Sequence, residues 1–254
     1  MTAQEKKTIY NLLKTVSSWT QSYPSEDFKE ELSFEDDIIL ENNLKNNSVN
    51  VADPKEEGTF LSPKPMTLET VKSRIEKCHS CSLCQERHYC VPGEGVENPL
   101  VMVIGEGPGE EEDLSGRPFV GKAGQLLDKM LNAIYLDRKK NCYITNIVKC
   151  RPPHNRAPMQ DEAASCSIFL STQIRILKPK SILALGRTAV QNLLKTENGI
   201  NALRGKIFDY NGIPLLATYH PSALLRDEGL KKLAWSDLKI FAGHLKNLYP
   251  DYMK

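Results

Sequence analysis

The sequence predicts an α/β protein, a three-layer α/β/α sandwich around a central four-stranded parallel sheet, with an N-terminal extension. Two observations carry this prediction. After residue 67, short apolar segments alternate with helix-like ones, which is typical of a parallel sheet covered on both faces. The first 66 residues instead have a polar, acidic composition. The chain of 254 residues is long enough for one sizeable domain, expected at 67–254, and this extension.

The extension, residues 1–66, divides in two. Near its start, four apolar residues recur at helical spacing: Ile9, Leu12, Leu13 and Val16. This spacing predicts a short amphipathic helix, which either packs on the rest of the chain or docks a protein partner. Acidic residues, Asn, Ser and Pro then dominate. Such a composition buries too little apolar surface to offset chain entropy, so we expect a largely disordered linker there.

The elements of the folded region follow in order. Thr67 has the side chain of an N-cap and predicts a helix that buries Leu68, Val71 and Ile75. Strands are expected at 100–107, 142–150, 181–186 and 215–221. Helices are expected near 123–135, 160–177, 187–195 and 231–248. Ligands of such sheets bind beyond the carboxyl ends of the strands, and the most unusual segments of the chain fall there.

Charge is distributed unevenly along the chain. Residues 1–69 carry a net charge of −6 and residues 70–254 a net charge of +7. The basic body makes nucleic acid the first candidate partner, although an ordinary solvated surface would also carry so modest an excess. The N-terminus has no signal-type apolar run, and no stretch approaches the length of a membrane span. We therefore expect a cytoplasmic protein with no membrane partner, whose seven cysteines stay reduced.

Four of the cysteines predict a metal site. Cys78 and Cys81 form a C-x-x-C at the start of the folded region, whereas Cys150 and Cys166 are widely spaced after the second strand. Such thiols in a chain without an export signal indicate metal ligation rather than disulfides. A zinc ribbon would repeat the close pair, so an iron–sulfur cluster fits better. Scattered buried cysteines are the alternative.

The loop after the first strand reads GEGPG, residues 105–109, and is followed by Glu110. A dinucleotide fingerprint would need Gly or Ala at that sixth position, and an acidic run follows where a pyrophosphate needs free helix N–H groups. A tight turn whose glycines let the backbone approach a flat ligand is the better interpretation. Phe119, in the next segment, is either ordinary core or an aromatic on which a base stacks.

Two polar residues mark later strands. Asn146 lies in an apolar strand, where burying an unpaired amide costs roughly 1–3 kcal/mol. Its side chain either makes a structural hydrogen bond or reads the edge of a base. Uracil offers an O4 acceptor and an N3–H donor, and a side-chain amide can pair with both. Cytosine has a donor and an acceptor in the reverse positions. His220 ends the fourth strand. A lone histidine is ordinarily a satisfied or surface residue, but opposite the glycine-rich loop it can donate to a developing oxyanion.

Four segments, GEGPGEEED, GRPFVGKAG, YITNIVKCRPP and YHPSALLR, together resemble the family 4 (iron–sulfur) uracil-DNA glycosylases. The resemblance covers about residues 70–248 and does not reach the N-terminal extension. It implies a monofunctional enzyme that releases uracil from single- and double-stranded DNA, starts base excision repair and associates with the nucleoid. A monomer is expected. It also implies a [4Fe–4S] cluster ligated by four cysteines: Cys78, Cys81, Cys150 and Cys166. Cys84 forms an overlapping C-x-x-C with Cys81 and is an alternative ligand.

The resemblance also implies roles for single residues. In the first loop, Glu106 and Gly107 would line the uracil pocket, with the Gly105 backbone alongside. Phe119 would stack on the base, Asn146 would read its edge, and His220 would face its O2. The loop that enters the DNA helix would contribute four residues: Ser222, Leu224, Leu225 and Arg226. One of the two leucines would be the wedge between bases, and the arginine would lie near a phosphate.

The group that positions the attacking water stays open. The best-known single-domain uracil glycosylases place an Asp before the Pro of the first loop, where this chain has Gly107. Glu106 or Glu112 could orient the water, unless Glu112 is only a solvated carboxylate favoured by the helix dipole. Phosphate groups could be contacted by three residues between two predicted cluster ligands: Arg151, His154 and Arg156.

Two other functions remain for the whole chain. It could be a non-catalytic iron–sulfur DNA-binding module whose acidic extension recruits a polymerase or repair partner, but that module would gain nothing from Phe119, Asn146 and His220 together. It could also be a glycosylase that traps its sugar covalently. That enzyme would need a nucleophile such as a histidine between Asp113 and Phe119, and the sequence has none there.

Overall fold

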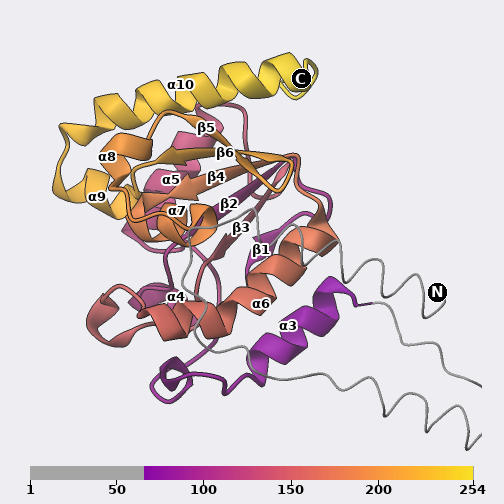
Figure 1. The fold of residues 1–254 in the computed structure, drawn as a ribbon, viewed down its shortest axis with the longest axis vertical. Coiled ribbons are helices and arrows are strands. Elements are labelled where there is room, and N and C mark those ends of the chain that lie inside the picture. The colour runs from indigo at the N-terminus through magenta and orange to yellow at the C-terminus, as the bar shows by residue number, and fades with distance from the viewer. Residues whose placement is uncertain (1–65, 254) are drawn as a thin grey trace, which may run out of the picture. The chain divides into compact units, whose positions relative to one another are not determined.

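The computed structural model describes residues 66–253, which form a mixed six-stranded sheet covered by helices on both faces (Figure 1). The strand order is β1-β3-β2-β4-β6-β5. The amphipathic helix and the linker that the sequence predicts for residues 1–66 lie, except for Met66, outside the described residues. Within the described part of the chain, none of the helices combines the length and the apolar character that crossing a membrane requires.

The four central strands are those that the sequence predicts, and they are parallel: β3 (Cys142–Asn146), β2 (Val101–Gly105), β4 (Ser181–Leu185) and β6 (Ile213–Thr218). The antiparallel edge strands β1 (Glu94–Gly95) and β5 (Ile207–Tyr210) were not predicted. β5 and β6 form a hairpin whose turn residues, Asn211 and Gly212, both have positive φ. An Asn-Gly pair between strands is a strong hairpin signal, and it could have identified β5.

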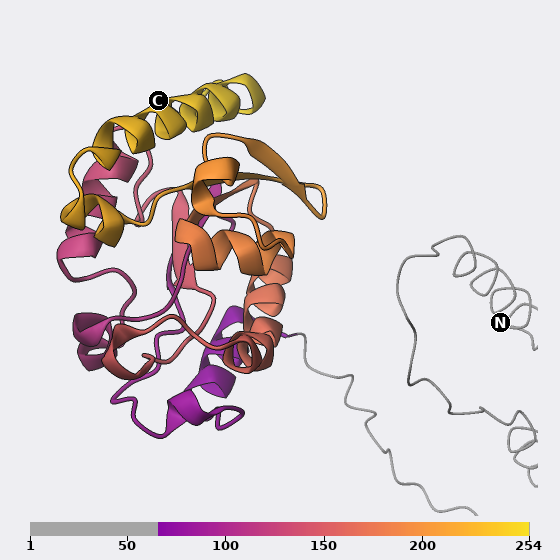
Figure 2. The same ribbon diagram turned by 60° about the vertical axis from the view of Figure 1, so that its left-hand side comes forward.

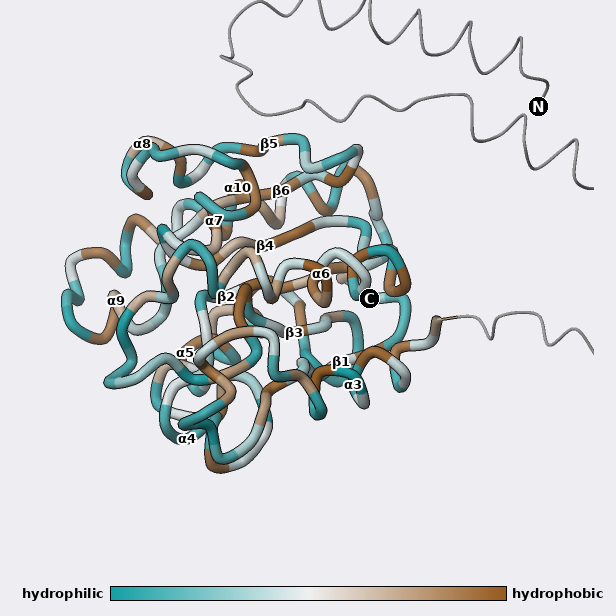
Figure 3. Tube along the Cα trace, turned by 60° about the horizontal axis from the view of Figure 1, so that its bottom comes forward, coloured by the Kyte–Doolittle hydropathy of each residue, from teal (hydrophilic) through white to brown (hydrophobic). Residues whose placement is uncertain are grey.

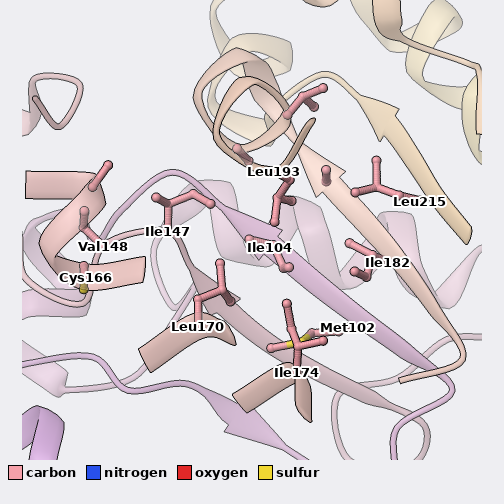
Figure 4. Packing of buried hydrophobic residues seen from close by; sticks show 14 of the residues in the cluster. Met102, Ile104, Ile147, Val148, Cys166, Leu170, Ile174, Ile182, Leu193 and Leu215 are labelled. Carbon is pink, nitrogen blue, oxygen red and sulfur yellow. The ribbon is translucent and has the colours of Figure 1, made fainter. Parts of the chain in front are cut away.

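One face of the sheet is covered by α6 (Gln160–Leu177), α7 (Gly186–Leu194) and the short α8 (Ile200–Leu203). Met102, Ile104 and Ile182 of the strands pack there against Leu170 and Ile174 of α6 (Figure 4). A further helix, α3 (Leu68–Glu76), packs on α6. Its N-cap is Thr67, which accepts a hydrogen bond from the Thr70 N–H at 3.2 Å, as the sequence predicts.

The opposite face is covered by α5 (Lys122–Asn132), α9 (Pro221–Arg226) and α10 (Leu230–Leu248) (Figure 2). Val101 and Val103 point to this side, because alternate residues of a strand face opposite sides of a sheet. All five residues of β2 are buried, as expected for a strand covered on both faces. The hydrophobic colour in Figure 3 accordingly follows inner strands such as β4, whereas the exposed helix α4 (Glu110–Ser115) is hydrophilic.

The parallel strands bring their carboxyl ends to one edge of the sheet. Gly105 at the end of β2 is in register with Asn146 at the end of β3, and Leu185 of β4 is in register with Thr218 of β6. The loops that follow these strands therefore lie together. They contain the glycine-rich turn, the start of α7 and His220, so the site that the sequence predicts is assembled by the topology of the sheet.

Candidate active site and cysteine cluster

A cavity of about 520 Å³ opens at the carboxyl edge of the sheet. Its walls come from the loop after β2, the segment before α5, the end of β3, the start of α7 and the β6–α9 loop. Nine of the predicted residues line it: Glu106, Gly107, Glu112, Phe119, Asn146, Arg156, His220, Ser222 and Arg226. The structure thus brings together residues from well-separated parts of the chain in one concave site, the usual setting of a ligand pocket.

Gly105 lies behind the cavity wall and allows its close packing. A Cβ atom at Gly105 would lie 2.5 Å from Asn146 Oδ1 and 2.5 Å from Phe119 Cζ, which is shorter than any ordinary contact. A larger residue would therefore displace both side chains. Gly105 acts by the absence of a side chain, which lets Asn146 and Phe119 approach its backbone. It does not itself line the cavity, and its expected place alongside the base stays a prediction.

Phe119 is held in a strained conformation by contacts that the sequence did not reveal. It is buried and has a φ of 53°, an uncommon value for a bulky residue. Arg138 donates hydrogen bonds to the carbonyl groups of Pro118 at 3.0 Å and Phe119 at 2.9 Å, and it pairs with Asp128 at 2.7 Å. Gly124 lets α5 approach the Phe119 carbonyl, since a Cβ there would lie 1.9 Å from that oxygen.

Asn146 is buried at the end of β3, with 1% of its surface exposed. Its Oδ1 atom has no hydrogen-bond partner among the described residues. A buried polar atom without a partner costs about 1–3 kcal/mol, so such an atom in a cavity wall indicates a site for a donor that arrives with a ligand. The alternative role for this side chain was a structural hydrogen bond. The Oδ1 atom makes no such bond to the described residues.

His220 presents a neutral ring with one free donor. Its Nδ1 accepts from the Ser222 N–H at 3.2 Å and lies 2.8 Å from Ser222 Oγ. Since Nδ1 accepts, the ring proton is on Nε2, which is buried and has no partner among the described residues. Burial, aided by Arg226 and opposed by Glu112, lowers the pKa of His220 to about 4. The ring centroid lies 5.5 Å from that of Phe119.

The two glutamates near the cavity differ in their contacts. Glu112 accepts hydrogen bonds from three backbone N–H groups, those of Gly109 at 3.1 Å, Val120 at 2.8 Å and Gly121 at 3.0 Å, which occupy both carboxylate oxygens. It therefore ties the glycine-rich loop to the segment before α5. Glu106 accepts a hydrogen bond from the Thr188 hydroxyl at the start of α7 through Oε2. Its Oε1 has no hydrogen-bond partner within the described region.

The β6–α9 segment separates the two leucines that were candidates for the wedge. Leu224 is 2% exposed and belongs to the core beneath α9, whereas Leu225 is 45% exposed. The prediction is corrected for Leu224, because its side chain is needed for packing and cannot reach outward. Arg226 is exposed at the cavity rim. Arg187, on α7, shares this rim without an ion pair in the described region, and the sequence interpretation missed it.

The arginines between the third and fourth predicted ligands are already paired. Arg156 forms a bidentate ion pair with the buried Glu162, at 2.7 and 2.8 Å, and this lowers the pKa of Glu162 to about 2. Glu162 also accepts from Ser82 Oγ at 3.1 Å, next to Cys81. Arg151 donates to Asn155 Oδ1 at 2.8 Å. Arg156 is therefore a structural link between the cavity and the cysteines, a role that differs from the expected phosphate contact.

The four predicted cysteines line a second, small cavity. Cys78 follows α3, Cys81 precedes the turn η1 (Ser82–Cys84), Cys150 follows β3, and Cys166 lies in α6. All four are free thiols, and Cys84 lines the same cavity. Arg87 donates to Cys150 Sγ at 3.0 Å, while burial raises the pKa of Cys150 to about 11.

Five of the residues that line this second cavity are cysteines, whose thiolates are the ligands of iron–sulfur clusters. Within residues 66–253, no group of three or more His, Cys, Asp or Glu side chains is placed to hold a single metal ion. The two remaining cysteines of the described region, Cys90 and Cys142, do not line the cavity. The residues present therefore fit a cluster in their chemistry and in their common location.

Comparison with known proteins identifies the family. The family model of the uracil DNA glycosylase superfamily matches residues 92–239. The chain belongs to this superfamily. It is 41% identical over 180 residues to a type-4 uracil-DNA glycosylase of Saccharolobus solfataricus, covering 68% of this chain and 83% of that protein. It is 42% identical over 176 residues to the type-4 uracil-DNA glycosylase of Thermotoga maritima, covering 68% of this chain and 91% of that protein.

A type-5 uracil-DNA glycosylase of Pyrobaculum aerophilum is less similar, at 34% identity over 150 residues, covering 53% of this chain and 66% of that protein. The type-4 matches confirm the family resemblance that the sequence motifs indicate. The region matched by the superfamily model contains every predicted residue of the large cavity. Cys78 and Cys81 precede that region.

Proposed function

We propose that this uracil-DNA glycosylase releases uracil in the cavity at the carboxyl edge of the sheet. The family defines the reaction, hydrolysis of the N-glycosyl bond of uracil in DNA during DNA repair. One observation supports the location above all others: in the wall of the same cavity, two buried polar atoms of opposite character, Asn146 Oδ1 and His220 Nε2, have no partner within residues 66–253. One needs a donor and the other an acceptor, and uracil supplies both through N3–H and O2.

Base recognition would begin with extrusion of the nucleotide, because the glycosidic bond is unreachable inside a duplex. Phe119 would stack on the extruded base. Asn146 would accept from N3–H through Oδ1 and donate to O4 through Nδ2. Cytosine would set an acceptor against Oδ1 and a donor against Nδ2, so both amide groups would stay unpaired. That mismatch accounts for selectivity without any contact to the opposite strand.

In the chemical step, the bond between C1′ and N1 breaks and its electron pair leaves with uracil. The sugar becomes oxocarbenium-like, and the negative charge on the base spreads to O2. The neutral His220 ring would donate a hydrogen bond from Nε2 to O2. This hydrogen bond would become stronger as negative charge develops on O2. Glu106 would orient the water through its free Oε1 and take its proton as oxygen bonds to C1′. Glu112 would hold the glycine-rich loop and the segment before α5 in position.

Contacts to DNA would come from the rim. Leu225 would fill the space that the extruded nucleotide leaves, and Arg187 and Arg226 would bind flanking phosphates. Both single-stranded and duplex DNA could then be substrates, since the base contacts need no second strand. We expect the enzyme to act as a monomer in association with the nucleoid, and a protein partner for residues 1–66 stays a prediction.

The small cavity would hold a [4Fe–4S] cluster through Cys78, Cys81, Cys150 and Cys166. Thiols from the segments after α3, before η1 and after β3, and from α6, share this cavity, and that convergence supports the proposal. Cys84 stays an alternative ligand. When bound, the cluster would cross-link these four segments and would carry no electron in the hydrolysis. The end of β3 joins the two cavities, since Asn146 lines one and Cys150 the other.

The test is uracil release from labelled single-stranded and U·G duplex oligonucleotides by anaerobically purified protein, followed by alkaline cleavage of abasic sites. We expect cleavage with both substrates and none with a cytosine control. DNA binding without release, by protein loaded with its cluster, would contradict the proposal and favour a non-catalytic DNA-binding module.

A further inference from the structure

Among the residues that the structure describes, Lys149 is a buried cation without a carboxylate partner. It lies between Asn146 and Cys150, and 1% of its surface is exposed. None of the ion pairs formed by the described residues includes it. Burying an uncompensated charge is costly, so buried charges are ordinarily paired or lie beside a metal centre. The position of this lysine therefore requires a source of negative charge.

The hydrogen bonds of Lys149 identify it as an ammonium group. Its Nζ donates to Thr145 Oγ1 at 2.5 Å, to the Asn146 carbonyl at 2.9 Å and to Gln173 Oε1 at 2.8 Å. Thr145 and Gln173 direct their own hydrogens to the Pro92 carbonyl, at 3.0 and 2.7 Å, so both present oxygen lone pairs to the lysine. Three acceptors match three N–H donors, which only the protonated amine has.

The missing negative charge lies on the cysteine side. Lys149 lines the cavity of the four cysteines. Four thiolates around an iron–sulfur core give the whole centre a net negative charge. The bound cluster would thus supply what the lysine lacks in the protein alone.

We infer that Lys149 is the buried counter-cation of the iron–sulfur cluster, and that the same ammonium group positions the end of β3 that carries Asn146. The inference rests on the proposed cofactor and goes beyond it by naming the residue that couples the two cavities. Lys149 is a positioning residue, since it reaches the Asn146 carbonyl and touches neither base nor sugar. Loss of the cluster would leave its charge uncompensated next to the base-reading amide.

The inference is tested with Lys149→Met, which removes the charge and keeps the length of the side chain. Lys140→Met, at an exposed lysine, is the matched control. Iron and sulfide content, cluster release to a ferrous chelator and the reduction potential are measured on the full chain purified anaerobically. We expect Lys149→Met to release the cluster about 10- to 100-fold faster, as for other groups that support metal ligands. Its reduction potential should shift to more negative values, because a positive charge that favours the added electron is gone.

Unchanged cluster release and an unchanged reduction potential in folded Lys149→Met protein would overturn the inference. If circular dichroism shows that this variant does not fold, Gln173→Glu decides instead. It places a carboxylate next to the ammonium group at nearly constant volume, so it should also lower the potential, and no shift would refute the proposal. If anaerobically purified wild-type protein contains no iron and sulfide, the proposed cluster is refuted. The uracil-release assay tests the proposed reaction independently of the cluster and of Lys149.

Discussion

At the scale of single residues, the candidate site depends on a few polar atoms whose partners are missing or are fixed by neighbours. Asn146 Oδ1 and His220 Nε2 have no partner in the described part of the chain, whereas Glu106 is held by Thr188. These differences separate residues that would touch the base from residues that would act through others. Three predictions follow from them.

Asn146→Asp should weaken the discrimination between uracil and cytosine. The carboxylate can still accept from N3–H, but it cannot donate to O4. Since an unpaired buried polar group costs about 1–3 kcal/mol, kcat/KM for uracil should fall by about tenfold or more. The measurement is kcat/KM on uracil and cytosine oligonucleotides, with Asn98→Asp, at an exposed position, as the control. Unchanged discrimination would show that this amide does not read the base.

Thr188→Val should lower kcat and leave KM nearly unchanged, because the hydroxyl holds the carboxylate of Glu106 rather than the substrate. A hydrogen bond to a charged group contributes about 1.5–3 kcal/mol, so we expect a loss of about tenfold or more. Thr188→Ser keeps the hydroxyl and should restore the rate. Equal rates for the valine and serine variants would argue against a positioning role for this hydroxyl.

His220 should remain neutral through the ordinary range of pH. Its pKa in the folded chain is lowered to about 4, and its unfolded value is about 6.5, so protons bind the unfolded state first. The contribution of this group to stability is therefore complete above about pH 6.5 and is lost as pH falls toward about 4. Nitrogen chemical shifts of the ring, followed against pH, measure this pKa. A titration of His220 near its unfolded value would contradict the assignment.

At the scale of elements, the loops and helix starts at the carboxyl edge of the sheet form the site, and single residues determine how these segments contact one another. Glu112 joins the start of α4 to the segment before α5. α9 buries Leu224 and exposes Leu225. The following two predictions distinguish the structural residues from those that face DNA.

Glu112→Ala should lower both the melting temperature and the rate of uracil release. Three backbone N–H groups would lose their acceptor, each at a cost of order 1 kcal/mol, and the two loops would separate. Calorimetry together with the release assay checks this. A large loss of rate at an unchanged melting temperature would instead mark Glu112 as the group that orients the water.

The adjacent leucines of α9 provide a matched pair. Leu225→Ala should slow uracil release from a U·A duplex and hardly affect release from single-stranded DNA, because a wedge matters only where a stack must be opened. Leu224→Ala should instead reduce the free energy of unfolding by about 2–5 kcal/mol, as for other leucines in a core. Urea denaturation and rates on both substrates measure the two effects, and a reversal between the variants would refute the assignment.

At the scale of the whole molecule, the fold was predictable where the sequence pattern is regular. The central strands and most helices follow from apolar segments of strand and helix length, and the N-cap Thr67 marks the start of α3. The edge strands were missed for different reasons. β1 has two residues and carries no pattern, whereas β5 is indicated by the Asn211-Gly212 turn and not by its apolar pattern.

The candidate site was predictable where its chemistry requires unusual residues at the ends of strands. The glycine-rich loop, Asn146, His220 and the cysteine spacing all stand out from their surroundings in the sequence. Arg138, Thr188 and Lys149 do not, because an arginine, a threonine or a lysine is common on any surface. Their roles arise from contacts to residues that are distant in the chain, as between Thr188 and Glu106, and no local pattern records such a contact.

The sequence by itself determined the order of strands and helices, the family, and the residue types available to bind a base and a cluster. These properties follow from hydrophobic periodicity and from motifs whose chemistry is local. Only the tertiary structure decided which of these groups are free. Among the described residues, it left Asn146 Oδ1 and His220 Nε2 without partners, occupied Glu112 and Arg156, buried Leu224 and left Leu225 exposed. The physical reason is that exposure and hydrogen bonding depend on neighbours in space, and only the folded chain brings those neighbours together.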